Sequence, residues 1–167
     1  MKNKILNEQK VDIAFFVPCF NEEKNITKTL DVLISSISKT SLTYEIIVVD
    51  DKSQDLTREV VKEYIAKSNS GMISLLENEI NMGLGRNYID TAFIANSKYY
   101  MLVNGDNAEP EETISRLISR VGEADMVVPY FGANDSRNFI RFYTSKTFTL
   151  LINLISGYKI HYYNGPV

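Results

Sequence analysis

Acidic and amide side chains follow three of the short apolar runs in this sequence. The clusters are Asn21-Glu22, Asp50-Asp51 and Asn104-Gly105-Asp106. Ligands of parallel α/β sheets bind beyond the carboxyl ends of the strands, so we expect the three clusters at one edge of a sheet. Crowded carboxylates repel one another unless a cation compensates them, and a divalent cation with oxygen ligands does so well. The pattern therefore predicts Mg²⁺ or Mn²⁺ bridging a diphosphate.

Each cluster also has a purely structural interpretation. Asn21 can cap a helix, with Glu22 favoured in the first helical turn. Ser53 or Asp55 can cap the next helix, but a cap does not explain Asp50. The third cluster fits an ordinary glycine turn. A binding site is favoured because the three clusters occur together on one predicted edge.

Short apolar runs rich in β-branched and aromatic residues alternate with stretches of helical periodicity. The predicted strands are Ile13–Val17, Tyr44–Val49, Met72–Leu76, Tyr99–Val103 and Asp125–Val128. The predicted helices open at Asn21, follow Asp55, cover Arg86–Ala95 and cover Glu111–Val121. Strict alternation of strand and helix predicts an α/β fold with a mostly parallel, Rossmann-like sheet and helices on both faces.

Three segments are expected along the chain. Residues 1–10 are mostly polar and predict a disordered tail, and residues 11–135 form the α/β domain. Residues 136–167 contain Asn138–Ser156, which is typical of one or two amphipathic helices with Arg141 and Lys146 beside apolar residues. Such a pattern suits a membrane interface that could receive an acceptor, or a helix packed on the sheet. The chain stops without a closing element, so we expect a truncated protein.

The composition excludes some classes of function. A net charge of −3 and a pI near 5.3 leave no overall basic field to attract nucleic acid. The only cysteine, Cys19, cannot form an internal disulfide, which favours a reducing compartment. No run approaches the roughly 18 apolar residues of a transmembrane helix, and the N-terminus lacks a signal-peptide pattern. We therefore expect a cytoplasmic protein that lies peripherally at a membrane surface.

The loop Glu77–Gly85 carries glycines before a predicted helix. It lacks the lysine of a P-loop, and it is not a dinucleotide fingerprint because Asn87-Tyr88 replaces the last glycine. Gly83 still permits a tight turn and close approach of a ligand. Arg86 can offer a cation to a phosphate, or can simply lie in solvent on the helix surface.

Four motifs occur together in a characteristic order and spacing. They are Val17-Pro18-Cys19-Phe20-Asn21-Glu22-Glu23, Ile47-Val48-Val49-Asp50-Asp51-Lys52-Ser53-Gln54-Asp55-Leu56-Thr57, Asn81-Met82-Gly83-Leu84-Gly85-Arg86-Asn87 and Val103-Asn104-Gly105-Asp106. The set resembles family 2 inverting glycosyltransferases of the GT-A fold, and within them the polyprenyl-phosphate sugar transferases of the dolichol-phosphate mannose synthase type. The resemblance covers residues 11–165, and its Asp-Asp-x-Ser-x-Asp-x-Thr segment is the most specific part.

The resemblance implies roles for the matching positions. Asp50 would hydrogen-bond the base or ribose with Asp51 beside it, and Asp106 would act in catalysis by holding the metal on the donor diphosphate. Arg141, the second catalytic candidate, and Ser145 would bind phosphates near the acceptor. The full set of implied donor-binding positions is Pro18, Phe20, Asn21, Glu22, Asp50, Asp51, Ser53, Gly83, Arg86, Asn104, Gly105, Asp106 and Ser145, with Asp106 and Asn104 as metal ligands.

The sequence also departs from the family pattern. Asn104 stands at the first position of the Asp-x-Asp metal motif, and an amide oxygen is a weaker ligand for a hard cation than a carboxylate. Ala108 stands where these enzymes carry a further polar ligand. The aspartate expected shortly before Gly165 is missing, and His161-Tyr162-Tyr163 stands there instead.

We therefore predict a glycosyltransferase of glycolipid or envelope-polysaccharide synthesis, with a UDP- or GDP-linked sugar as donor and a polyprenyl phosphate as acceptor. A hydroxyl acceptor would need a general base, and the residues after 110 offer no convincing one. The alternatives are a non-catalytic nucleotide- or lipid-binding module, which Asn104 favours, and a nucleotidyltransferase. The last is disfavoured because Pro18–Glu22 is not a glycine-rich basic loop.

Overall fold

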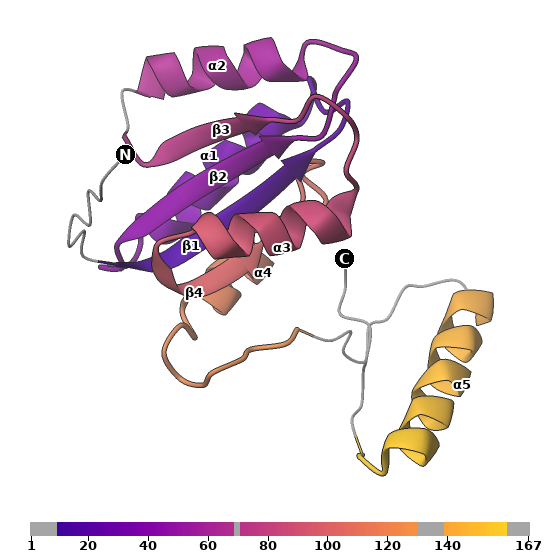
Figure 1. Cartoon of the computed structure of the whole chain (residues 1–167). Helices are drawn as coiled ribbons and strands as arrows, with labels where there is room; N and C mark the ends of the chain where they lie inside the picture. The colour runs from indigo at the N-terminus through magenta and orange to yellow at the C-terminus, as the bar shows by residue number, and fades with distance from the viewer. Residues whose placement is uncertain (1–9, 69–70, 130–138, 160–167) are drawn as a thin grey trace, which may run out of the picture. The chain divides into compact units, whose positions relative to one another are not determined.

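Figure 1 shows the computed structural model, which describes residues 10–68, 71–129 and 139–159. The chain divides into two units, residues 1–123 and 124–167, and each is described by itself. The division lies before residue 135, where the sequence places the end of the α/β domain. Residues 1–9 of the predicted tail lie outside the described residues.

The first unit is built on one four-stranded sheet whose strands all run parallel. In sheet order the strands are β3 (Ile73–Glu77), β2 (Tyr44–Asp50), β1 (Val11–Cys19) and β4 (Ser97–Leu102). Cys19 of β1 pairs with Asp50 of β2, which in turn pairs with Glu77 of β3. β1, β2 and β3 therefore end level with one another, whereas β4 ends at Leu102, which pairs with Phe16. The loops that follow all four strands leave from the same edge of the sheet. The predicted parallel sheet is confirmed.

Helices cover both faces of this sheet, as expected (Figure 1). The helices of the first unit are α1 (Ile26–Ile37), α2 (Thr57–Ser68), α3 (Leu84–Ile94) and α4 (Glu111–Ile118). The larger core lies on one face, where α1, α2 and α4 meet alternate strand residues. Its buried members include Ile13, Phe15, Val17, Ile46 and Val48 from the strands and Leu30, Leu33, Val61, Ile114 and Ile118 from the helices. Removal of these side chains from water is the main force that holds the unit together.

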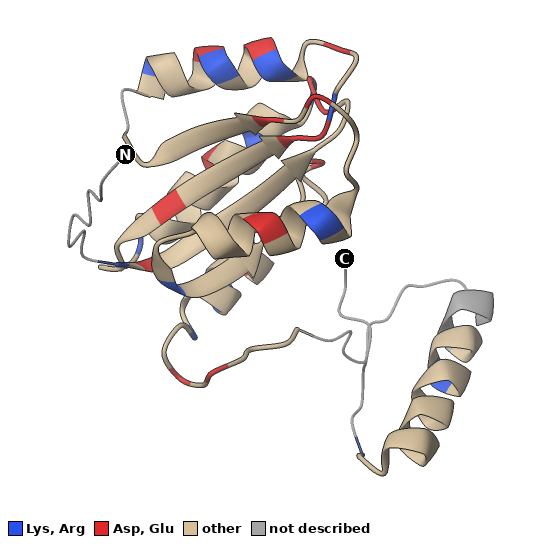
Figure 2. Cartoon of the chain, viewed as in Figure 1, with Lys and Arg blue, Asp and Glu red and all other residues tan. Residues whose placement is uncertain are grey.

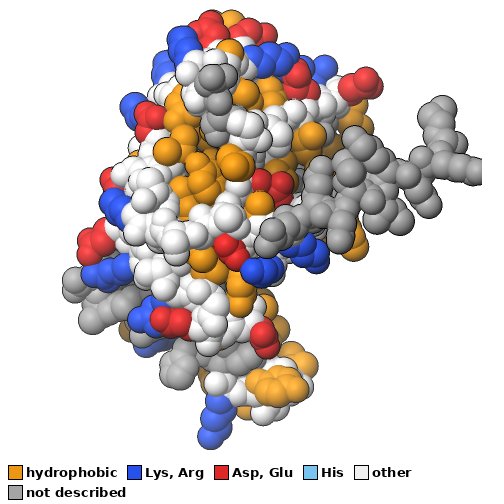
Figure 3. Space-filling model, turned by 90° about the vertical axis from the view of Figure 1, so that its left-hand side faces the viewer, with side chains coloured by type: hydrophobic (Ala, Val, Ile, Leu, Met, Phe, Trp, Pro, Cys, Tyr) orange, Lys and Arg blue, Asp and Glu red, His pale blue; other side chains and the backbone are white. Residues whose placement is uncertain are grey.

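A smaller core lies on the α3 face. Phe16 and Ile47 are buried there, and the ring of Tyr88 from α3 meets Phe16 edge-on with centroids 6.0 Å apart. Much of α3 stays in contact with solvent, and Phe93 is 85% exposed. Figure 3, which views the side at the left of Figure 1, also shows hydrophobic side chains at the surface.

The predicted strand at Asp125–Val128 is wrong, because these residues form no strand and the sheet ends at β4 among the described residues. Met126 is 77% exposed and Val128 is 51% exposed. An apolar run of this length becomes a strand only when a neighbouring strand supplies hydrogen bonds and burial. No described strand supplies either to this segment.

The second unit contains one described helix, α5 (Phe139–Ser156), where the sequence allows one or two. Many of its apolar side chains are exposed, namely Phe148, Leu150, Leu151, Leu154 and Ile155. Threonines lie among the apolar residues of this helix in the sequence, so the apolar side chains do not form one clearly separate stripe. The amphipathic character of this segment therefore stays a prediction. Across the described ranges, we find no helix with the length and apolar character that a bilayer crossing requires.

Candidate functional site

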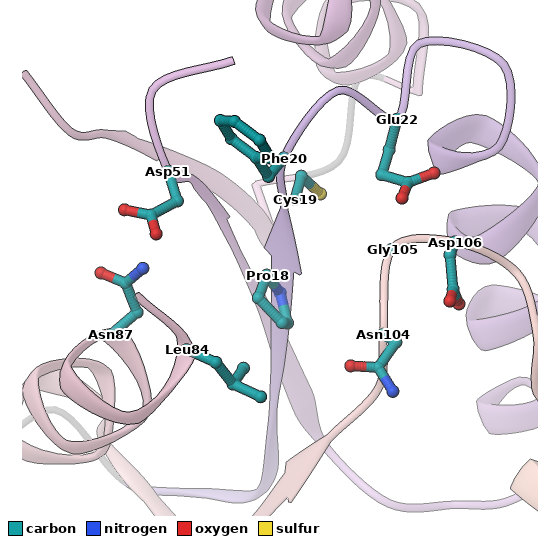
Figure 4. A pocket seen from close by; sticks show the side chains of 10 residues that line it. All are labelled: Pro18, Cys19, Phe20, Glu22, Asp51, Leu84, Asn87, Asn104, Gly105 and Asp106. Carbon is teal, nitrogen blue, oxygen red and sulfur yellow. The ribbon is translucent and has the colours of Figure 1, made fainter. Parts of the chain in front are cut away.

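An open pocket of about 200 Å³ lies at the carboxyl edge of the sheet (Figure 4). It is lined by residues from the end of β1, the loops after β2 and β4, and the start of α3. The lining residues are Pro18, Cys19, Phe20, Glu22, Asp51, Leu84, Asn87, Asn104, Gly105 and Asp106. Acidic residues occur in the loops at this edge (Figure 2). The structure thus brings seven of the sequence-predicted positions to one pocket, namely Pro18, Phe20, Glu22, Asp51, Asn104, Gly105 and Asp106.

Asn21 and Ser53 lie outside the pocket lining and tie the loop after β1 to the loop after β2. The backbone N–H of Asn21 donates to Ser53 Oγ at 3.0 Å, and Asn21 Oδ1 accepts from the N–H of Gln54 at 2.7 Å. The N–H of Glu22 donates to Thr57 Oγ1 at 2.8 Å. Much of the family-like Ser-x-Asp-x-Thr pattern therefore serves to position the pocket walls.

Asp50 also lies behind the pocket instead of lining it. Its side chain is fully buried, forms an ion pair with Arg58 and accepts from the N–H of Ser53 at 3.2 Å. Arg58 in turn donates from Nη2 to the carbonyl of Asn78 at 2.9 Å. A buried carboxylate needs such partners. Asp50 and Arg58 thus hold the loop after β3, and the implied contact of Asp50 with a base or ribose stays a prediction.

Asp51 holds the loop before α3 against the sheet edge. Its carboxylate is 6% exposed and accepts from the N–H groups of Met82 and Gly83 and from Asn78 Nδ2, each at 2.8 Å. Gly83 has a φ of 78°, which glycine adopts without strain. Burial alone would raise the pKa of Asp51, but these hydrogen bonds together lower it. Asp51 is therefore an anion fixed by the loop.

Asn87 is a pocket residue that sequence reasoning missed. It extends from α3, is 5% exposed, and accepts at Oδ1 from Asn78 Nδ2 at 2.8 Å. Its Nδ2 makes no hydrogen bond of good geometry within the described chain, although the amide lies near enough to Asp51 to help lower the pKa of that carboxylate. Figure 4 shows Asn87 and Asp51 together at one end of the pocket. Helical spacing could have indicated Asn87, because Asn87 and Thr91 lie one helical turn apart and are the buried positions of α3.

The loop after β4 is pressed against the end of β1. The N–H of Val103 donates to the carbonyl of Phe16 at 2.9 Å, and the N–H of Gly105 donates to the carbonyl of Pro18 at 3.1 Å. A Cβ atom at Gly105 would lie 2.7 Å from Cys19 Sγ and 2.8 Å from the Pro18 carbonyl oxygen. Both distances are too short for a side chain, so this close approach requires glycine.

Cys19 and Leu84 also line the pocket and were not among the sequence candidates. Burial raises the pKa of the Cys19 thiol, and the charges of Asp50, Glu22 and Asp55 raise it further. The thiol therefore stays neutral and cannot act as a thiolate nucleophile. Its contribution is the packing against Gly105.

The other end of the pocket is open and carries acidic and amide groups. Asp106 is exposed, and its Oδ1 accepts from the N–H of Ala108 at 3.0 Å. Figure 4 shows Glu22, Asp106 and Asn104 on the same side of the pocket, away from Asp51. Nowhere among the described residues do three histidine, cysteine or acidic side chains cluster as a ready-made metal site. A cation here would therefore need ligands from a bound molecule as well.

Three sequence candidates remain, and Arg86, the one in the first unit, does not line this pocket. Arg86 is exposed on α3 and pairs with Asp90 at 2.6 Å, one helical turn away. Ser145 lies half-buried on α5 in the second unit, and the side chain of Arg141 lies outside the described residues. Their predicted phosphate contacts stay predictions.

Known proteins resemble this chain in sequence and in fold. The dolichyl-phosphate beta-glucosyltransferase of Dictyostelium discoideum is 31% identical over 121 residues, which cover 70% of this chain and 36% of that protein. Residues 1–349 of S. aureus TarS, solved with UDP-GlcNAc, are 25% identical with a TM-score of 0.56, covering 76% of this chain and 36% of that one. The chain spans less than half the length of the curated relatives it matches first.

A mannosyltransferase from Pyrobaculum calidifontis, solved with GDP-Man and Mn²⁺, shares the fold at 19% identity. Its TM-score is 0.55, and the match covers 68% of this chain and 33% of that one. The model of the family "Glycosyl transferase family 2" matches residues 14–166, which is most of the chain. With the parallel sheet and the pocket at its carboxyl edge, that match leads to one conclusion: the chain belongs to glycosyl transferase family 2.

Proposed function

We propose that this chain forms the donor-binding domain of a glycosyltransferase that takes its sugar from a nucleotide diphosphate sugar. The observation that carries this proposal is the two-ended pocket at the carboxyl edge of the sheet. One end offers buried hydrogen-bonding groups, and the other offers the exposed carboxylate of Asp106 with the partly buried side chains of Asn104 and Glu22. A nucleoside with a charged diphosphate matches both ends, and edges of this kind are where parallel α/β sheets bind ligands.

The buried end suits the nucleoside. Asp51 provides a fixed acceptor, and Asn87 Nδ2, which lies near Asp51 but makes no hydrogen bond of good geometry in the described chain, provides a hydrogen-bond donor. Phe20 is 46% exposed at the pocket, so its ring is available to pack against a base. Hydrogen-bonding groups that are held in fixed positions before the ligand binds reduce the entropic cost of recognition.

The open end suits the diphosphate and a divalent cation, Mg²⁺ or Mn²⁺. Asp106 and Asn104 would hold the cation, and the exposed Asp106 carboxylate fits oxygen ligation of a hard ion. The ion would supply stabilisation of the negative charge that develops on the leaving diphosphate. With these two protein ligands, oxygens of the diphosphate would have to complete the site, so we expect donor and cation to bind together.

A polyprenyl phosphate is the acceptor we propose, and its phosphate oxygen would attack the sugar carbon with inversion. Such an acceptor is already anionic and needs no general base. The carboxylates in the pocket lining are Glu22, Asp51 and Asp106. We assign them to orienting the sugar donor and its cation, not to removing a proton from the acceptor. The Dictyostelium discoideum relative is named for dolichyl phosphate, which supports the same class of acceptor.

We also propose that the protein works peripherally at the cytoplasmic face of a membrane, where a lipid phosphate is available. The support is the row of exposed apolar side chains on α5, of which Leu154 is 72% and Ile155 is 82% exposed. Burial of such side chains in the interfacial layer of a bilayer is favourable. The free thiol of Cys19 is compatible with a reducing compartment.

Calorimetric titration of the whole chain with UDP- and GDP-linked sugars, with and without Mn²⁺, tests the donor proposal. We expect one nucleotide class to bind, with Mn²⁺ strengthening the binding at least tenfold. Asp106→Ala should abolish that Mn²⁺ effect, whereas the control Asp125→Ala changes an exposed carboxylate of the second unit and should keep it. Failure of every nucleotide diphosphate sugar to bind would refute the proposal.

Flotation with phosphatidylcholine–phosphatidylglycerol vesicles tests the membrane proposal separately. We expect the wild-type chain to float and the variant Leu154→Glu/Ile155→Glu to stay in solution. The control Glu112→Gln/Glu123→Gln changes two exposed residues of the first unit and should float like the wild type. Equal flotation of all three proteins would count against α5 as the membrane contact.

A further inference from the structure

Asn104, which lines the pocket, is hydrogen-bonded to a residue that lies outside the pocket lining. Its Nδ2 donates to Glu109 Oε1 at 3.0 Å. Glu109 is half-buried and does not line the pocket. Its other carboxylate oxygen, Oε2, is buried and has no hydrogen-bond partner in the described chain.

The backbone brings Glu109 back to Asn104 by a tight turn. Asn107 has a φ of 57°, in the left-handed region that asparagine tolerates better than most residues. The N–H of Ala108 donates to Asp106 Oδ1 at 3.0 Å and stabilises this turn. As a result, a carboxylate five positions along the chain reaches the amide that stands beside the proposed cation.

An amide, unlike a carboxylate, has one end that can bind a cation and one that cannot. Its oxygen is a ligand, whereas its NH₂ group is a donor with no lone pair to offer. Because Nδ2 is held by Glu109, Oδ1 is the atom left for the pocket. Figure 4 shows the oxygen of Asn104 turned toward Pro18 and the nitrogen turned away from it.

We propose that Glu109 is a positioning residue that fixes the Asn104 amide with its oxygen toward the divalent cation. This inference rests on the proposed function, since it concerns the cation that would hold the donor diphosphate. A carboxylate at position 104 would present an oxygen in either orientation and would need no such partner. Glu109 therefore allows an asparagine at position 104 to act as a ligand of the cation.

The test is a double-mutant cycle on the whole chain, with Mn²⁺ affinity as the readout. Free Mn²⁺ is measured by electron paramagnetic resonance in the presence of the nucleoside diphosphate, UDP or GDP, that the wild type binds. Partners that orient a metal ligand contribute roughly 10–100-fold to affinity, and we expect Glu109→Ala to weaken Mn²⁺ binding about tenfold. Glu109→Gln keeps an acceptor for Asn104 Nδ2 and should lose much less.

In the Asn104→Asp background, Glu109→Ala should cause no loss, because a carboxylate at position 104 needs no orientation. The matched control is Glu112→Ala, which removes an exposed carboxylate paired with Arg116 and should leave Mn²⁺ affinity unchanged. Melting temperatures of all variants show whether each one is folded.

Two results would overturn the positioning role while leaving the proposed function intact. One is unchanged Mn²⁺ affinity in Glu109→Ala. The other is an equal loss from Glu109→Ala in the wild-type and Asn104→Asp backgrounds, which would mark Glu109 as a general source of negative charge. If the wild type bound no nucleotide together with Mn²⁺, the proposed function and this inference would both fail.

Discussion

The carboxylates at the two ends of the pocket differ in burial and in the number of hydrogen bonds that they accept. Asp51, at one end, is 6% exposed and accepts hydrogen bonds from Met82, Gly83 and Asn78. Asp106, at the other end, is exposed, and the N–H of Ala108 is the donor seen for it. The first carboxylate is therefore part of the folded structure, whereas the second is available to a ligand.

Because of this difference, we expect Asp51 to contribute to the stability of the fold and Asp106 to contribute to ligand binding. A carboxylate that holds a loop through several donors cannot be removed without leaving those donors unpaired, so its loss should weaken the fold. An exposed carboxylate has water as an alternative partner, so its loss should weaken only what binds to it. Substitutions at the two ends should therefore give opposite patterns of stability and affinity.

The largest effect on stability is expected for Asp51→Ala. The change leaves two backbone N–H groups and the Asn78 amide without an acceptor, at roughly 1–3 kcal/mol for each group that stays buried. Because water can reach part of the loop, we expect a loss of about 3 kcal/mol in the free energy of unfolding. Urea denaturation measures it. A loss below about 1 kcal/mol would mean that the loop is held by other contacts.

A somewhat smaller loss is expected for Gly105→Ala. Its new Cβ would meet Cys19 Sγ and the Pro18 carbonyl oxygen, so the loop after β4 would have to move away from β1. Overpacking of this kind costs about 2 kcal/mol, and donor affinity should fall as well because Asn104 and Asp106 flank the glycine.

Gly85→Ala is the matched control for that variant. Position 85 lies in α3, and a Cβ there meets no atom within 4 Å. Alanine favours a helix over glycine by up to about 1 kcal/mol, so this variant should be as stable as the wild type or more stable. Equal destabilisation of both variants would contradict the steric explanation at Gly105.

The same comparison shows how far sequence reasoning reaches. The alternation of apolar runs and helical periodicity predicted β1 to β4, and parallel strands bring their following loops to one edge whatever the details. Asp50 and Asp51 are adjacent in the sequence, yet only Asp51 reaches the pocket. That choice depends on Arg58, which pairs with Asp50 from the next helix, and no local pattern reveals this pairing.

Other features depend on contacts that no local pattern contains. Asn87 becomes a pocket residue because the loop held by Asp51 sets the start of α3. Met126 and Val128 have strand-forming neighbours in sequence, but no described strand pairs with them to form a ladder. The hydrogen bond from Asn104 to Glu109 depends on the left-handed turn at Asn107, which the composition of the loop permits but does not dictate.

A smaller effect is expected from acid. The pKa of Asp51 is lowered in the folded protein, so its carboxylate contributes stability above the unfolded pKa of about 3.9, and this contribution is lost as the pH falls through the folded pKa. The wild type should therefore lose stability more steeply below about pH 4 than Asp51→Asn does. Urea denaturation between pH 3 and pH 6 measures both slopes, with Asp125→Asn as the control for an exposed carboxylate. Parallel curves for wild type and Asp51→Asn would contradict the fixed anion at this end.

The smallest effect on stability is expected at the open end. Asp106→Ala removes an exposed carboxylate with one backbone donor, so the free energy of unfolding should change by less than about 0.5 kcal/mol. The strengthening of nucleoside diphosphate binding by Mn²⁺ should nevertheless be lost, because Asp106 is a proposed ligand of that cation. Urea denaturation and calorimetry on the same preparation measure the two quantities. If Asp106→Ala lost both stability and binding, the open end would be part of the folded framework after all, and the two ends would not differ in kind.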